Sequence, residues 1–278
     1  MKTFLKVLLV LPLILLSSCR SDDAETDRVT DLESKTYVLS TVNNSDISGT
    51  VRLIKNSNFT LSIELIVEGV IDNDLRSAFL FIDNAANDGG VVALTLDPLF
   101  GDGTTGTSTT VFTALDDETS ISYEELLAFD GHIQVRSNDA DIDNSEAHAV
   151  ADIGQNELTN SQVTYTLEER DLINASGSIT FKKRLNGEAL AVIDLEGTPS
   201  SGMLPAHIHA NDAAIGGPII FTFNMVNGTT GSSQTNVETL DDNTSFLYDD
   251  VLTVNGYVNV HFENNLSLLI AQGNIGSN

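Results

Sequence analysis

The sequence predicts an all-β protein built from two tandem antiparallel Greek-key β-sandwich domains, each with one short helix. Apolar and polar residues alternate with a period of two, as in Thr60–Val67, which is the pattern of half-buried strands. Clusters of Gly, Asn and Asp interrupt such runs at the spacing of turns. An internal repeat divides the 278 residues into two units of ordinary domain size.

Residues 1–18 predict a signal peptide for export. Lys2 and Lys6 supply a short positive region, and the apolar run Val7–Leu16 is too short to span a bilayer as a stable helix. The run leads into Leu16-Ser17-Ser18-Cys19, which resembles the lipobox of bacterial lipoproteins. This resemblance implies cleavage before Cys19 and acyl chains on that residue, which makes it a lipid anchor. The alternative is an ordinary secretory signal that contains a cysteine.

Residues 19–35 predict an acidic tether between the anchor and the first unit. The stretch Arg20–Glu25 resembles the short acidic tags that follow the cysteine in some surface-exported lipoproteins of Gram-negative bacteria. A plain solvated linker is the alternative, because composition does not separate the two. The resemblances together imply an exported protein, held by lipid at the outer membrane or cell surface of a Gram-negative bacterium.

Residues 36–160 and 161–278 are the two copies of the repeat. The matched strings are Ile47–Leu53 with Ala175–Phe181, Glu68-Gly69 with Glu196-Gly197, Gly103–Gly106 with Gly228–Gly231, and Leu115–Ser120 with Leu240–Ser245. Their order and spacing agree, so chance is a poor explanation. The period is far longer than that of a solenoid repeat, which predicts two whole domains rather than an array.

Each copy contains matching strand and helix signals. The alternating run Thr60–Val67 has its counterpart in Ala189–Leu195, which is more continuously apolar. Ser122–Leu127 places Ser three residues before Glu and ahead of apolar residues, which predicts a capped helical turn. Leu247–Leu252 is its counterpart in the second copy.

Three of the five His residues predict a metal site in the second copy. His207 and His209 flank Ile208 in a strand-like segment, so both imidazoles point to one face, about 6.6 Å apart at their Cα atoms. His261 ends another strand-like run, Gly256–His261. If the two strands are neighbours, three imidazoles converge. Copper and zinc both accept imidazole ligands, and no thiolate is close by in the sequence.

The same residues resemble a known family. The string AHIHANDAAIGGPIIFTF and the later string GYVNVHF are similar to the two motifs of the CHRD (chordin) domain, and the match covers about residues 165–278. The resemblance implies a secreted, extracytoplasmic β-sandwich module, but no established reaction. This chain departs from the family at Leu269–Ile275, where a charged pair usual in the family is missing.

The first copy is a degenerate member of the pair. By the internal match, Phe79 and Phe81 stand opposite the two strand His residues, and Arg136 stands opposite His261. His132 falls opposite Tyr257, so it does not restore the group. The joint loss of three imidazoles favours a shared task for them in the second copy, although drift would also produce it.

A looser resemblance connects the three His residues to Cu/Zn superoxide dismutase. A His-x-His strand and a late third His in a Greek-key sandwich are similar to the copper half of that enzyme, which would make His207, His209 and His261 copper ligands. The bridging His, the zinc ligands, the disulfide and a substrate-steering Arg have no evident counterpart. Local hydrogen bonding without any metal is a further alternative for paired strand His residues.

Composition excludes several functions. The chain has 13 Lys and Arg against 40 Asp and Glu, a formal net charge of −27, which argues against nucleic acid as a partner. The single Cys excludes a disulfide within the chain. The sequence thus predicts a lipid-anchored binding protein whose protein or ligand partner is not named by any motif. A redox enzyme and a purely structural or adhesive module are the alternatives.

Overall fold

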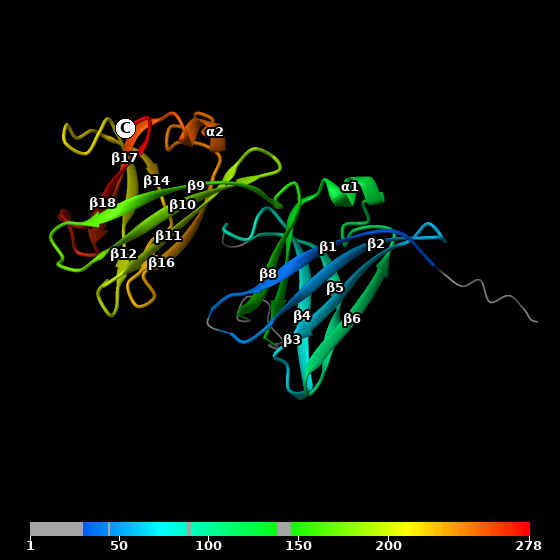
Figure 1. Cartoon of the computed structure of the whole chain (residues 1–278). Coiled ribbons are helices and arrows are strands. Elements are labelled where there is room, and N and C mark those ends of the chain that lie inside the picture. Colours follow the sequence, from blue (N-terminus) through cyan, green and yellow to red (C-terminus); the bar gives the residue numbers. More distant parts are fainter. Residues whose placement is uncertain (1–29, 44, 88–89, 138–145) are drawn as a thin grey trace, which may run out of the picture.

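The prediction of an all-β protein in two tandem units is confirmed by the computed structural model, which describes residues 30–43, 45–87, 90–137 and 146–278 (Figure 1). Two antiparallel sheets follow one another along the chain, and each unit carries one short helix. The predicted signal peptide, Cys19 and the start of the predicted tether lie outside the described residues. Within the described residues, no helix is both long and apolar enough to cross a membrane.

The first unit is a closed eight-stranded barrel. Its elements are β1 (Asp31–Thr41), β2 (Ser48–Asn56), β3 (Leu61–Glu68), β4 (Asp72–Ile82), β5 (Val92–Asp102), β6 (Thr105–Phe112), α1 (Tyr123–Leu127), β7 (Asp130–Arg136) and β8 (Ala147–Gly154). The strand order is β1-β2-β3-β6-β5-β4-β7-β8, in which the pairing of β3 with β6 gives a Greek-key connection. A two-residue pairing between β1 and β8 closes the ring.

The second unit repeats these pairings in an open ten-stranded sheet. Its elements are β9 (Leu158–Glu169), β10 (Ser176–Arg184), β11 (Ala189–Glu196), β12 (Met203–Leu204), β13 (Ala206–Ala210), β14 (Ile219–Thr222), β15 (Val226–Asn227), β16 (Ser232–Val237), α2 (Tyr248–Val251), β17 (Asn255–Phe262) and β18 (Asn265–Gly276). The sheet order is β12-β15-β16-β11-β10-β9-β18-β17-β13-β14. The short strands β12 and β14 therefore end the sheet, whereas the first unit has no free edge of this kind.

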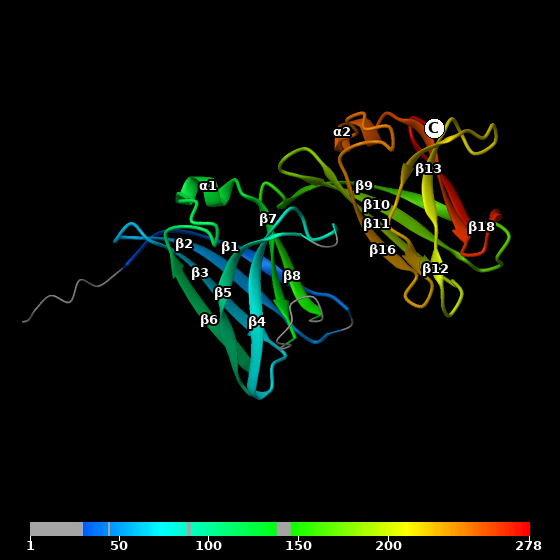
Figure 2. The ribbon, with the colours of Figure 1, turned by 180° about the vertical axis from the view of Figure 1, so that it is seen from behind.

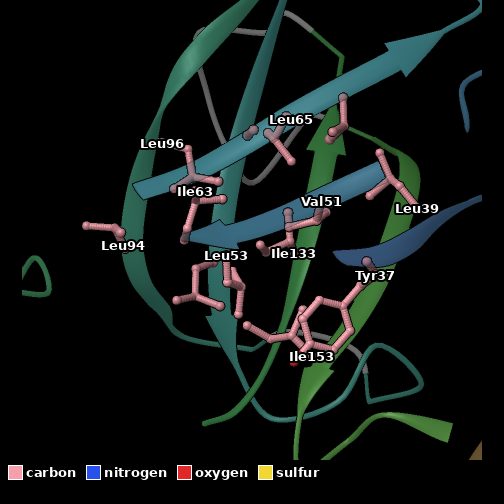
Figure 3. Close-up of a cluster of buried hydrophobic side chains, with 14 of the residues drawn as sticks. Tyr37, Leu39, Val51, Leu53, Ile63, Leu65, Leu94, Leu96, Ile133 and Ile153 are labelled. Atoms are coloured by element: carbon pink, nitrogen blue, oxygen red, sulfur yellow. The ribbon is translucent and has the colours of Figure 1, made fainter. Parts of the chain in front are cut away.

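Each unit buries its own apolar core. In β3, side chains on one face, such as Ile63, Leu65 and Val67, are fully buried, and Glu64, Ile66 and Glu68 on the other face are at least partly exposed. Figure 3 shows Val51, Leu53 and Ile63 reaching from neighbouring strands into one shared interior. The alternation predicted for this run is thus confirmed, and burial of its apolar face holds the sheet together.

The two predicted helical turns are also present. At α1, the Ser122 side chain accepts a hydrogen bond from the Glu125 N–H (3.2 Å), and the Ser122 N–H donates to the Glu125 carboxylate (2.8 Å). This reciprocal pair is the capping box that the sequence predicts. Figures 1 and 2 show α1 and α2 at corresponding places in the two units, as a repeat requires.

Candidate metal centre

Neighbouring strands bring the three His residues together. β13 pairs antiparallel with β17, with His207 opposite Asn259 and His209 opposite Tyr257 (β13 is labelled in Figure 2). The His261 N–H donates to the carbonyl of Pro205 (2.8 Å), directly before β13. Side chains along β13 point alternately to the two faces of the sheet. Ile208 is therefore fully buried in the core, and the imidazoles of His207 and His209 lie on the opposite face.

The three imidazoles lie close enough to hold one metal ion. One nitrogen from each of His207, His209 and His261 falls within a set whose members are all within 4.8 Å of one another. The ring centroid of His207 is 5.3 Å from that of His261 and 6.1 Å from that of His209, and the third separation is 6.2 Å. The convergence predicted from the sequence is confirmed.

Backbone carbonyls fix the orientation of two rings. His209 Nδ1 is 2.9 Å from the carbonyl oxygen of Gly217, and His261 Nδ1 is 2.8 Å from that of Leu266. A carbonyl only accepts, so each Nδ1 carries the proton and donates it, which leaves the lone pair on Nε2. Metal-binding His residues commonly use this arrangement, because the second hydrogen bond sets the tautomer and the direction of the ligand lone pair.

One nitrogen in each of the three rings is buried without a hydrogen-bond partner among the described residues. These atoms are His207 Nδ1, His209 Nε2 and His261 Nε2, each shielded from solvent and without a hydrogen bond to any residue that the structure describes. A buried polar atom without a partner costs about 1–3 kcal/mol, so one such atom in each of three neighbouring rings is costly. A metal ion is a partner that would satisfy three lone pairs at once.

Tyr257 supports His209 from the neighbouring strand. Its ring stacks on the imidazole with 5.0 Å between centroids and an interplanar angle of 16°. Its hydroxyl oxygen accepts a hydrogen bond from the Gly217 N–H (3.2 Å). Gly217 therefore donates its N–H to Tyr257 and accepts a hydrogen bond from His209 at its carbonyl. Tyr257 thus positions the residue whose carbonyl orients His209.

The lowered pKa values of His207 and His261 favour the neutral form of these two imidazoles. Burial lowers the pKa of His207, and the nearby His261 and His209 lower it further. Burial also lowers the pKa of His261, although its hydrogen bond to Leu266 opposes the shift. Neutral imidazole is the form that binds metal. Near neutral pH, a metal ion therefore has few protons to displace from these two rings.

In the first unit, Phe79, Phe81 and Arg136 occupy the positions that are equivalent to the three His residues. Phe79 lies opposite Gln134 and Phe81 opposite His132, which is the register of the His residues in β13, so the equivalence inferred from the sequence is confirmed. His132 stacks on Phe81 (5.2 Å, 10°) and donates to the carbonyl of Asp83 (2.7 Å). Its other nitrogen lies 2.9 Å from the Gln134 amide. Arg136 takes the place of His261.

Sequence reasoning missed the groups around the rings. The carbonyls of Gly217 and Leu266 and the hydroxyl of Tyr257 are the immediate partners of the His residues and their supporting loop. The Gly216-Gly217 pair shortly after the His-x-His segment was the available signal, because glycine permits such close approach.

A comparison with protein-family models finds no match to the chain, and a search of curated proteins finds none either.

Proposed function

We propose that the chain is an exported, lipid-anchored binding protein of the CHRD type, whose second unit holds one copper or zinc ion through His207, His209 and His261. The observation that carries the proposal is the set of three buried, unpartnered imidazole nitrogens on one face of the sheet. Cys19 would be the lipid anchor, as its lipobox-like context implies.

The donor set selects the metal. Three neutral imidazoles suit copper and zinc, and they are poor ligands for calcium or magnesium, which take oxygen donors. Three protein ligands leave at least one coordination position for water or for a group from a binding partner. That open position is what would let such a centre take part in recognition.

A binding role is favoured over redox catalysis. The competing reading is a copper enzyme of the superoxide-dismutase kind that uses the same three His residues. The formal net charge of −27 works against it, because an acidic surface repels an anionic substrate and slows its approach. The third reading, a purely structural or adhesive surface module, requires no metal at all.

Metal analysis of the purified protein tests the proposal. The protein is stripped with a chelator, reconstituted separately with Zn²⁺ and Cu²⁺, dialysed, and analysed for bound metal per chain. We expect one ion per chain, and none after replacement of His207, His209 and His261 by Ala. His148→Gln, in the first unit, is the matched control and should keep the metal.

Three outcomes would decide against parts of the proposal. No stoichiometric copper or zinc in the folded, reconstituted protein would end the metal hypothesis. Rapid, copper-dependent loss of superoxide that disappears in the His-to-Ala variant would replace the binding role by the enzyme role. Retention of fold and of a partner by the same variant would favour the structural module.

A further inference from the structure

Arg184 is a charged residue in an unusual place, fully buried at the end of β10. Its guanidinium extends from the second unit and contacts the first unit. Nη1 donates to the Asp152 carboxylate (2.6 Å) and to the carbonyl of Asn156 (2.5 Å). Nε donates to the Asn236 side-chain oxygen (2.9 Å), which belongs to the second unit. One side chain thus joins β8 of the first unit to β10 and β16 of the second.

The turn that follows Arg184 reinforces this contact. The Leu185 N–H donates to the carbonyl of Glu157 (3.0 Å), and the Asn186 N–H donates to that of Gln155 (3.0 Å). Both acceptors lie in the short connection between β8 and β9. The connection between the units is therefore hydrogen-bonded to the second unit along its length and is not a free linker.

The repeat supplies an internal comparison for Arg184. β2 and β10 are equivalent strands, matched through Ser48-Gly49 and Ser176-Gly177, so Asn56 is the counterpart of Arg184. The Asn56 amide donates to the Ser62 hydroxyl (2.7 Å) inside its own unit. The fold therefore accepts a short neutral amide at this position, and it does not by itself require a buried arginine.

The same comparison applies to the acidic partner. Asp152 lies opposite His132, and Asn274 lies opposite Tyr257, which makes Asn274 its counterpart. In both units one side-chain oxygen accepts from a loop N–H, from Ala85 to Asp152 (2.7 Å) and from Ala213 to Asn274 (2.9 Å). Asp152 differs in its second, charged oxygen, and that oxygen receives Arg184.

We propose that the Arg184–Asp152 ion pair fixes the relative orientation of the two units, so that they behave as one rigid body. The charged pair occurs where the two units meet. The position equivalent to Arg184 in the first unit carries Asn56, and the position equivalent to Asp152 in the second unit carries Asn274. The Arg184 side chain is 0% exposed and that of Asp152 16%, so water screens the attraction little. This inference is independent of the proposed metal.

The repeat also provides the test variants. Arg184→Asn and Asp152→Asn each introduce the residue that the chain itself uses at the equivalent place, so each unit should keep its fold. Residual dipolar couplings of the full chain measure whether one alignment tensor fits both units. We expect one tensor for the unmodified protein and two for either variant, with the unchanged far-ultraviolet circular dichroism of a folded β protein.

A surface pair in the same unit serves as control. Lys183 lies next to Arg184 in β10 and pairs with Asp249 (2.9 Å) on an exposed surface. Lys183→Asn should leave a single tensor. The double variant Arg184→Asn with Asp152→Asn should reorient the units no more than either single change, because the two residues act as one pair.

Three results would overturn the proposal. The first is a single, unchanged tensor in folded Arg184→Asn and Asp152→Asn proteins. The second is loss of the common tensor in Lys183→Asn as well, which would make the effect one of general charge. The third is a strictly additive double variant, which would mean that Arg184 and Asp152 act separately.

Discussion

Replacement of Gly217 by Ala should weaken metal binding through His209 without touching a ligand. A Cβ atom at this position would lie 2.0 Å from the carbonyl oxygen of Ala210, the residue that follows His209 in β13. Gly217 does not have a positive φ, so the obstacle is steric: the main contact is with the Ala210 carbonyl group, and the Asn211 amide nitrogen lies 3.0 Å away. Because the obstacle is backbone, a flexible side chain cannot move aside to relieve it.

The size of the effect follows from the hydrogen bond that Gly217 makes. Relief of the contact requires a shift of about 1 Å or more, because real Cβ atoms essentially never approach below 3.0 Å. Taken up by the loop, that shift would lengthen the 2.9 Å bond between His209 Nδ1 and the Gly217 carbonyl beyond hydrogen-bond range. Loss of such a supporting bond typically costs about 10–100-fold in metal affinity, or about 1.4–2.7 kcal/mol.

Isothermal titration of the stripped protein with Zn²⁺ measures the change, and Gly187→Ala is its control. Gly187 lies in the turn after β10 with φ of +92°, and a Cβ there would meet only the Leu247 side chain at 3.8 Å. This second variant should lose about 1 kcal/mol of stability from its left-handed conformation and keep the zinc affinity. Denaturant titration separates the two effects.

Two results would contradict this prediction. Gly217→Ala could retain the zinc affinity of the unmodified protein while folded, which would mean that the carbonyl does not orient His209. Gly187→Ala could weaken zinc binding equally, which would assign the loss to stability of the whole unit. Either result refutes a directed role for the Gly217 peptide.

Three further changes have defined outcomes. Burial lowers the pKa of His132 below its usual 6.5, so the unfolded chain binds the extra proton more readily, and stability of the first unit should fall as pH drops below about 6.5 and through the folded pKa. His132→Phe should flatten that dependence in urea unfolding, and an unchanged pH slope would contradict it. Tyr257→Phe keeps the stacked ring but removes the acceptor of the Gly217 N–H, so zinc affinity should fall up to about tenfold in calorimetry, whereas Tyr248→Phe should have no such effect. Ser122→Ala removes the cap of α1 and should cost about 1 kcal/mol in urea unfolding, and a neutral result would mean that the helix contributes nothing to the first unit.

Much of the fold could be predicted because its signals are local or repeated. Alternation identified the strand that is now β3, and a Ser-to-Glu spacing identified the capped turn at α1. Closure of the first barrel could not be predicted in this way. It depends on the pairing of Ser40 with Val150 and Thr41 with Ala149, and two residue pairs between distant segments leave no periodic pattern.

The candidate site was predictable in its ligands and not in its supports. His207 and His209 share a face because strand geometry is periodic, and that much is written in the sequence. The partners of the rings are main-chain carbonyls, which every residue carries, so composition gives no sign of them. Arg184 was missed for the opposite reason: a charged residue usually lies in water, and the charged partner of its buried guanidinium lies in the other unit.

The two units together argue that the second site has a ligand. The fold of the first unit places aromatic rings and hydrogen-bonded polar groups at the equivalent positions, and His132 there has a partner for each ring nitrogen. The architecture is thus able to fill this face without leaving polar atoms unpartnered. The second unit instead buries three imidazoles with one unpartnered nitrogen each, at about 1–3 kcal/mol per atom. A cost that the fold can avoid, and that is carried at three adjacent positions at once, is offset most simply by an ion that all three nitrogens bind.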